Sequence, residues 1–285
     1  MQINNKKKAI IFMILASFFF TTMNMFGKLS EGMNPYQKTF ITNFVATIIV
    51  CIIIKRKNAS FFGKSENRKY LLIRGIAGTI SICAFYFSLE YLFLSDATML
   101  NQLSPFFTII FSFLLLKEKL TKKQLICLLV AFIGCIFIVR PQFNSSILPA
   151  LMGIFAAATA GLAYTMIRVI GDKENFFTVI LSFSGVATIS CFPSLFADKN
   201  GLTLFNISVM AAAGLSFMLG QIFLTLAYRN APASEISMYS YIGLIIAAIY
   251  GLLIFYEIPD IYSVIGYVII IFASFVNILS KKRKI

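Results

Sequence analysis

Ten apolar stretches of about 16–22 residues occupy most of this chain of 285 residues. A helix of roughly 20 apolar residues is long enough to cross the ~30 Å hydrocarbon core of a membrane. The connections between the stretches are mostly too short to form a folded soluble domain. The sequence therefore predicts an all-α integral membrane protein with ten transmembrane helices, at roughly 9–27, 37–54, 70–89, 95–116, 124–139, 147–167, 177–196, 207–228, 234–255 and 261–280.

The composition and the first stretch agree with this interpretation. Hydrophobic residues make up 59% of the chain and charged residues only 13%, whereas about a quarter of a soluble domain is charged. Lys6, Lys7 and Lys8 precede the first stretch, as in a signal peptide. The stretch is too long for one, and no small-residue cleavage site follows it before Asn24 and Lys28. We expect a retained transmembrane helix.

The net charge of +14 is divided unevenly between the two sides that the ten helices define. Twenty Lys and Arg residues fall on the side that holds both termini and the 55–69 loop, and four fall on the other; Arg74 begins a helix near the basic side. Because basic loops stay in the cytoplasm, we expect a multi-pass protein of the bacterial inner membrane with both termini cytoplasmic. The charge then encodes orientation and not nucleic-acid binding, with anionic membrane lipid as a secondary partner.

An internal repeat divides the chain. The segments 95–118 and 234–257 are versions of one another, 139 positions apart. In each, an acidic residue, a Ser or Thr and a Met open an apolar helix, and a glutamate closes it. We therefore expect two related repeats, 1–141 and 142–285, of five helices each. Because five is an odd number, the second repeat enters the membrane in the opposite direction, as in transporters that work by alternating access.

Several short motifs are spread over both repeats. They are Leu94-Ser95-Asp96-Ala97, Leu103-Ser104-Pro105, Lys117-Glu118-Lys119-Leu120, Arg74-Gly75, Gly134, Arg140-Pro141, Leu226-Ala227-Tyr228, Pro232-Ala233-Ser234 and Tyr256-Glu257. Together they resemble the EamA-type repeat of the drug/metabolite transporter superfamily, over essentially the whole chain. The resemblance implies transport of small organic solutes, such as amino acids and related metabolites. It also implies that the first, third, fourth, sixth, eighth and ninth helices surround a central cavity. A carrier of S-adenosylmethionine-like metabolites is a narrower alternative.

Polar side chains form stripes at helical spacing within the apolar stretches, and such side chains tend to face the interior of a helix bundle. A carboxamide has four hydrogen-bonding positions to satisfy, which favours a solute cavity, whereas isolated Ser, Thr and Gly more often permit close helix packing. Pro105 removes a backbone donor and is expected to bend the fourth helix, although its second-repeat counterpart is Leu244. The predicted substrate-binding residues are Asn24, Ser81, Tyr86, Asn101, Gln102, Pro105, Tyr164, Gln221, Tyr239 and Tyr241.

Acidic residues lie near the predicted helix ends, and the chain has no histidine. Glu118 and Glu257 are expected to pair with lysine or to cap a neighbouring helix, and Asp96 and Glu235 to favour the positive ends of their helix dipoles. A carboxylate proton carrier at the membrane centre is unsupported, so transport is either uncoupled or coupled through a cation site of backbone carbonyls. A nearly uncharged cavity suits a zwitterionic or neutral solute, or a small cation stacked on aromatic rings.

Other function classes lack the residues that they need. A membrane-embedded transferase needs a catalytic cluster, which the 55–69 loop does not hold, and a channel needs a ring of like polar groups from several subunits. The five cysteines lie within apolar stretches without paired spacing, so we expect neither a disulfide framework nor a metal site. We expect no enzyme activity, no cofactor and no nucleic-acid partner. The expected partners are a small-molecule substrate and membrane lipid, and the protein is a monomer or a homodimer.

Overall fold

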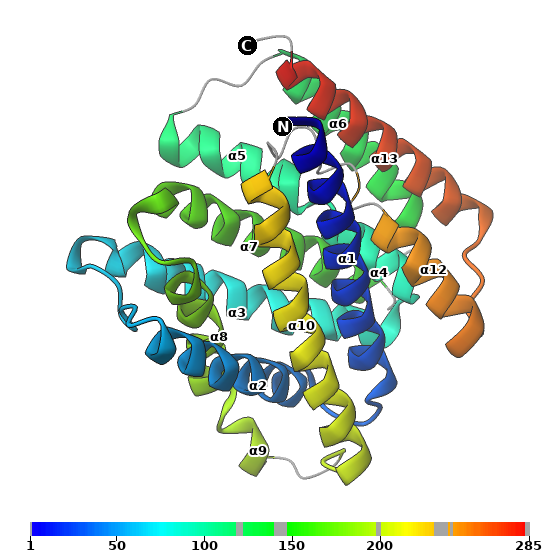
Figure 1. The fold of residues 1–285 in the computed structure, drawn as a ribbon. Coiled ribbons are helices and arrows are strands. Elements are labelled where there is room, and N and C mark those ends of the chain that lie inside the picture. The colour runs from blue at the N-terminus through cyan, green and yellow to red at the C-terminus, as the bar shows by residue number, and fades with distance from the viewer. Residues whose placement is uncertain are drawn as a thin grey trace.

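The computed structural model describes residues 2–117, 122–139, 147–197, 201–230, 239 and 242–282. The regular elements in these residues are helices throughout (Figure 1). Single turns of 3-10 helix precede α3, at Ser65–Asn67, and follow α7, at Gly171–Lys173. The α-helices are α1 (Gln2–Leu29), α2 (Pro35–Arg56), α3 (Arg68–Tyr91), α4 (Leu94–Asn101), α5 (Ser104–Leu116), α6 (Lys122–Val139), α7 (Ile147–Ile170), α8 (Phe176–Cys191), α9 (Ser194–Ala197), α10 (Leu204–Asn230), α12 (Ile242–Ile254) and α13 (Ile261–Lys282).

Seven helical segments of the described chain are long and apolar enough to cross a membrane. They are Lys7–Leu29, Pro35–Arg56, Ser65–Tyr91, Leu94–Leu116, Ile147–Ile167, Phe176–Phe196 and Leu204–Leu224. Three further apolar helices are shorter, at Leu125–Ile138, Ile242–Ile254 and Ile261–Ala273. The predicted all-helical, multi-pass membrane architecture is therefore confirmed, while the number of ten spanning helices stays a prediction.

The start of α2 shows how local sequence sets a helix boundary. The Asn34 side chain accepts a hydrogen bond from the Gln37 amide at 2.9 Å, and the Gln37 side chain accepts one from the Asn34 amide at 3.1 Å. Pro35 occupies the first helical position, where no intrahelical N–H partner is required. This reciprocal cap satisfies two backbone donors and makes α2 begin a few residues after α1 ends.

The fourth apolar stretch is an interrupted helix. α4 ends at Asn101, and α5 begins at Ser104 with Pro105 in its first turn. The Gln102 amide still donates to the carbonyls of Thr98 and Met99, so the chain tightens there before the second helix starts. Proline cannot donate to the preceding turn and clashes with it. The bend predicted at Pro105 is confirmed, and it takes the form of a break at Gln102 and Leu103.

Close helix pairs hold the bundle together. α1 packs along α10, α3 along α7, and α6 along α13, the last two visible side by side at one edge of the bundle (Figure 1). Where α6 and α13 meet, a Cβ added to Gly134 would lie 3.0 Å from the carbonyl oxygen of Gly266, and one added to Gly266 would lie 2.7 Å from that of Gly134. Glycine at both positions lets the two backbones approach, as in other membrane helix pairs.

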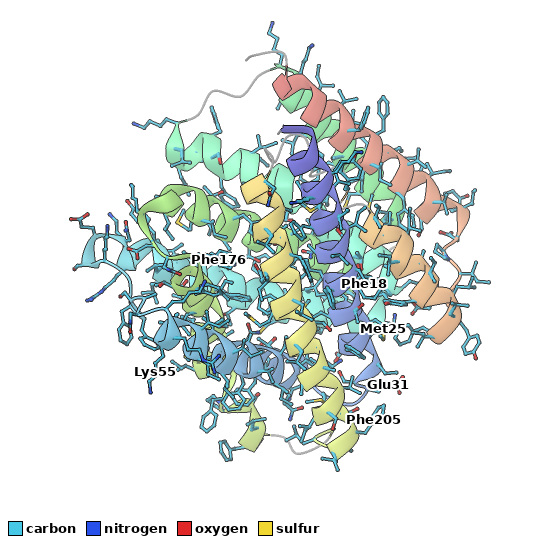
Figure 2. The ribbon with its side chains drawn as sticks, in the orientation of Figure 1. Phe18, Met25, Glu31, Lys55, Phe176 and Phe205 are labelled. Carbon is cyan, nitrogen blue, oxygen red and sulfur yellow. The ribbon has the colours of Figure 1, made fainter. Side chains whose placement is uncertain are left out.

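The buried core mixes the two parts of the chain. One cluster joins Phe85 of α3 to Phe183 of α8 and Phe217 of α10. Large apolar side chains also cover the outside, and two of them, Phe18 on α1 and Phe205 on α10, are marked in Figure 2. A helix that is apolar on both its packed and its outer face is typical of a protein surrounded by lipid.

Candidate functional site

The helices that carry the predicted substrate-binding residues contact one another. α4, which ends at the helix break, packs against α1 and α3 and also against α7 and α12. α1 contacts α3, α10 and α12 in turn, and α3 contacts α7. The break is therefore surrounded by helices from both parts of the chain.

Asn101 and Gln102 lie at the break itself. Both side chains are half-buried, and the backbone of Pro105 begins the next helix. Asn24 of α1 is buried, and the neighbouring Thr21 donates a hydrogen bond to the carbonyl of Gly243 in α12 at 3.2 Å. This contact links α1 to the second part of the chain one turn from Asn24.

Two predicted residues of α3 use their hydroxyl groups between helices. The Ser81 hydroxyl donates to the carbonyl of Ala156 in α7 at 2.8 Å. The Tyr86 hydroxyl lies 3.2 Å from that of Thr42 in α2, and its side chain is fully buried against Gly27. These contacts correspond to the packing role that hydroxyl groups also have in membrane helices.

The remaining predicted residues are spread along the bundle. Gln221 of α10 is half-buried and Tyr164 of α7 is 44% exposed. Tyr239 packs against the cluster of Ala9, Met13 and Ala227, at the other end of α1 from Asn24. Asn101 and Gln102, which are neighbours in the sequence, thus lie together at the break, whereas Tyr239 and Asn24 lie apart. Tyr241 lies outside the described residues.

A charged cluster lies where α1, α4 and the α12–α13 connection meet. Lys28 forms an ion pair with Glu257, and each side chain is 13% exposed. The Lys28 ammonium also donates to the carbonyl of Leu92, and the second carboxylate oxygen of Glu257 accepts from the Leu94 amide at 2.9 Å. The roles predicted for Glu257, pairing with lysine and capping a neighbouring helix, are both confirmed. Glu118 and Glu235 lie outside the described residues.

Asp96 extends this cluster. It lies in the first turn of α4, where a carboxylate favours the positive end of the helix dipole, as predicted. The Tyr267 hydroxyl of α13 donates to its carboxylate at 2.5 Å and lies 3.0 Å from the Ser95 hydroxyl. The start of α4 is therefore fixed by groups from the last part of the chain.

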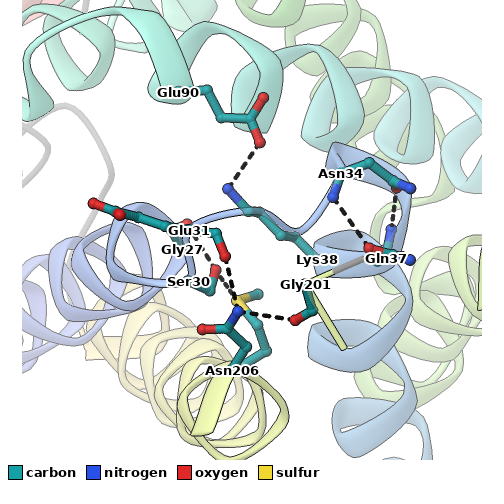
Figure 3. Close-up of polar contacts among 10 residues, drawn as sticks. Gly27, Ser30, Glu31, Asn34, Gln37, Lys38, Glu90, Gly201 and Asn206 are labelled. Carbon is teal, nitrogen blue, oxygen red and sulfur yellow. Dashed lines mark hydrogen bonds and ion pairs between the residues drawn. The ribbon is translucent and has the colours of Figure 1, made fainter. Parts of the chain in front are cut away.

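The α1–α2 connection is held by a second set of polar contacts, drawn in Figure 3. Lys38 is 2% exposed and pairs with Glu90 at the end of α3 at 3.0 Å. The Asn206 amide group donates to the carbonyls of Glu31 and Gly201, each at 2.8 Å. The Lys38–Glu90 pair joins α2 to α3, and the Asn206 contacts join the α1–α2 connection to the start of α10.

Sequence analysis did not place three cations among the functional residues: Lys28, Lys38 and Arg74. Each lies in a candidate membrane-spanning segment, where an ionisable side chain is rare and usually functional or paired. That signal was present in the sequence for all three. Lys28 and Lys38 have carboxylate partners, whereas Arg74 of α3 stacks on Phe183 with 4.8 Å between its guanidinium carbon and the ring centre.

Comparison with known proteins decides the family. The EamA-like transporter family matches residues 7–140 and, a second time, residues 147–279. This chain belongs to that family. The pseudopaline exporter CntI of Pseudomonas aeruginosa (strain UCBPP-PA14) is 28% identical over 281 residues, which cover 98% of each chain. Solute carrier family 35 member G1 of Mus musculus is 24% identical over 92% of this chain and 77% of its own length.

The fold has a counterpart among solved proteins. One crystal structure aligns with a TM-score of 0.67 over 97% of this chain and 98% of its own, at 14% identity. At that identity the likeness concerns the fold alone. The family and its named relatives, and not this structural likeness, indicate a multi-pass membrane transporter rather than an enzyme.

Proposed function

We propose that this EamA-family protein is a secondary transporter that moves a small organic metabolite across the bacterial inner membrane by alternating access. The observation that carries the proposal is the interrupted α4–α5 segment. α4 contacts α1 and α3 from the first part of the chain and α7 and α12 from the second. A broken helix between two repeats is where secondary transporters commonly bind their solute, because the break frees backbone groups and leaves room for side chains to converge.

The proposed architecture is ten spanning helices in two inverted repeats, 1–141 and 142–285. Support comes from the tandem family matches, whose boundary falls between residues 140 and 147. Among the described residues, the same boundary leaves five apolar helical segments in each part, when α4–α5 and α8–α9 are each taken as one segment. With an odd number in each, the repeats face opposite ways and either one can close the path on its own side.

The proposed solute is an amino acid or a related zwitterionic, neutral or cationic metabolite. The site would use Asn101 and Gln102 at the break, Asn24 on α1 and Gln221 on α10. The name of the CntI relative supports an organic metabolite and suggests export as the direction of transport. The Lys28–Glu257 pair, which joins the two proposed repeats, would have to separate when the path opens on that side.

Solute counterflow into proteoliposomes tests this proposal. A thermal-shift screen first selects an amino acid or amino-acid derivative that stabilises the purified protein, since a ligand of the folded state raises its melting temperature. Saturable counterflow of that compound is expected for the wild type. Asn101→Leu and Gln221→Leu should each lower the rate at least about tenfold without loss of membrane insertion, because leucine suits the lipid phase and cannot form the hydrogen bonds to the solute.

Ser208→Leu is the matched control for Gln221→Leu. Ser208 lies on the same helix, is exposed, and donates a hydrogen bond to the carbonyl of Leu204 within α10. This control should transport at the wild-type rate. Wild-type rates for both the Asn101 and the Gln221 variants would show that these side chains form packing seams and not the solute site.

A further inference from the structure

Arg74 is a buried cation inside a membrane-spanning helix. Its side chain is 6% exposed, and it lies six residues after α3 begins at Arg68. At 1.5 Å per residue, this places it about 9 Å along the helix, beyond the helix end where a lysine or arginine normally meets water. Burying a guanidinium is costly unless its charge is balanced and its N–H groups are bonded.

The surroundings of Arg74 hold its guanidinium in one place. The group stacks on the ring of Phe183 in α8. A Cβ added to Gly78, one turn further along α3, would lie 2.5 Å from a terminal nitrogen of Arg74 and 2.7 Å from the Phe183 ring. Glycine therefore provides the space in which the cation lies.

The Nε atom of Arg74 is sealed from solvent and has no hydrogen-bond partner in the part of the chain that the structure describes. The ion pairs found in the same part engage Lys28 and Lys38 and leave Arg74 without a counter-charge. The Phe183 ring offers π-electron density but no negative charge. Within the described residues, the site thus holds a desolvated cation without an anion that would balance it.

We infer that Arg74 binds the carboxylate of the transported metabolite. This inference rests on the proposed transport function and narrows its solute class, because the cavity then contains one positive charge and is not uncharged. The planar guanidinium matches the two oxygens of a carboxylate in a bidentate pair. One cation balances one negative charge, which suits a carboxylate better than a doubly charged phosphate.

Efflux of two matched mixtures from proteoliposomes tests the inference. One mixture holds the twenty common amino acids, and the other holds the same compounds with the α-carboxylate converted to a carboxamide. Mass spectrometry follows what leaves the vesicles. The wild type should release the acids roughly 10- to 100-fold faster than the amides, as expected when hydrogen bonds to a charged group are lost. Arg74→Gln should remove this preference, and Arg74→Lys should restore only part of it.

Arg68→Gln is the control, because Arg68 is exposed at the start of the same helix. It should keep the wild-type preference. A second measurement separates binding from structure: Arg74→Met should melt at the wild-type temperature or above, because it removes an unbalanced buried charge. A melting temperature that falls by several degrees would identify Arg74 as a structural residue and overturn the inference.

The remaining outcomes are also decisive. Retention of the acid preference by Arg74→Gln, or equal release of acids and amides by the wild type, overturns the role of Arg74 while the transport function stands. A wild type that releases neither mixture faster than empty vesicles contradicts the proposed transport of amino-acid-like solutes, and the inference about Arg74 falls with it.

Discussion

At the scale of single residues, the Lys28–Glu257 pair is expected to be sensitive to mutation. Both side chains are 13% exposed, and Lys28 has few other partners, the Leu92 carbonyl and the Phe255 ring among them. Lys28→Met would leave the Glu257 carboxylate buried without its counter-charge. Removal of one member of a buried pair typically costs about 3–5 kcal/mol. We expect the melting temperature in detergent to fall by several degrees.

A double variant provides the control. Lys28→Met combined with Glu257→Gln removes both charges and keeps a side-chain oxygen for the Leu94 amide, which Glu257 caps. This double variant should recover part of the lost stability, with a coupling free energy of about 1–3 kcal/mol between the two sites. Additive effects of the two single changes would contradict the ion pair.

How far single residues could be predicted depends on where their partners lie in the sequence. The pairing and capping roles of Glu257 followed from its place at a helix end beside water. Its particular partners, Lys28 and the Leu94 amide, are 229 and 163 positions away and follow from the packing of α1 and α4. The sequence placed Arg74 at a helix start near the basic side. Its burial could not be predicted in the same way, because it depends on Gly78 and on Phe183 from another helix.

At the scale of helices, the crossing of α6 and α13 depends on two glycines. A Cβ on Gly266 would lie 2.7 Å from the carbonyl oxygen of Gly134 and 2.6 Å from Ile138. A backbone atom cannot move aside as a flexible side chain can, so Gly266→Ala must push the helices apart. We expect a loss of about 1–3 kcal/mol in the free energy of unfolding, the usual cost of overpacking. Thermal denaturation of the purified protein measures it.

Gly185→Ala is the matched control on a different helix. Its added Cβ would meet only Leu181 of the same helix, at 3.8 Å, an ordinary contact. Alanine is also the better helix former, so this variant should be as stable as the wild type or slightly more stable. If Gly266→Ala left the melting temperature unchanged as well, the backbones of α6 and α13 would lie further apart than in the structure.

Helices were predicted well where the signal was local and less well where it was not. The lengths of the apolar stretches predicted the helical segments. Pro105 predicted the break between α4 and α5, because a proline disturbs the helical turn that precedes it. Which helices pair is a tertiary property. The Ser81 hydroxyl, assigned to the solute from its stripe, bonds to α7, since a stripe of small polar groups looks the same in a cavity and in a packing seam.

At the scale of the whole molecule, the predicted family membership is confirmed, while the two repeats, their inverted arrangement and the orientation in the membrane stay predictions. Orientation is set by the positive charges of the loops during membrane insertion, and these charges have little effect on how the helices pack. In Figure 2, Lys55 near the end of α2 and Glu31 just before its start lie toward opposite ends of that helix.

Cysteine labelling in intact cells tests the orientation. In a background from which the five native cysteines have been removed, single cysteines would replace Lys64, in the basic 55–69 loop, and Ile258, in the α12–α13 connection. Both positions are exposed, so access to a membrane-impermeant maleimide depends only on the side of the membrane. With twenty basic residues on the side of Lys64 and four on the other, the positive-inside rule places Lys64 in the cytoplasm.

Ile258→Cys should react in intact cells, and Lys64→Cys only after the cells are broken. Because both should react after breakage, protection in intact cells cannot be mistaken for a buried thiol, and the reverse pattern would invert the proposed topology.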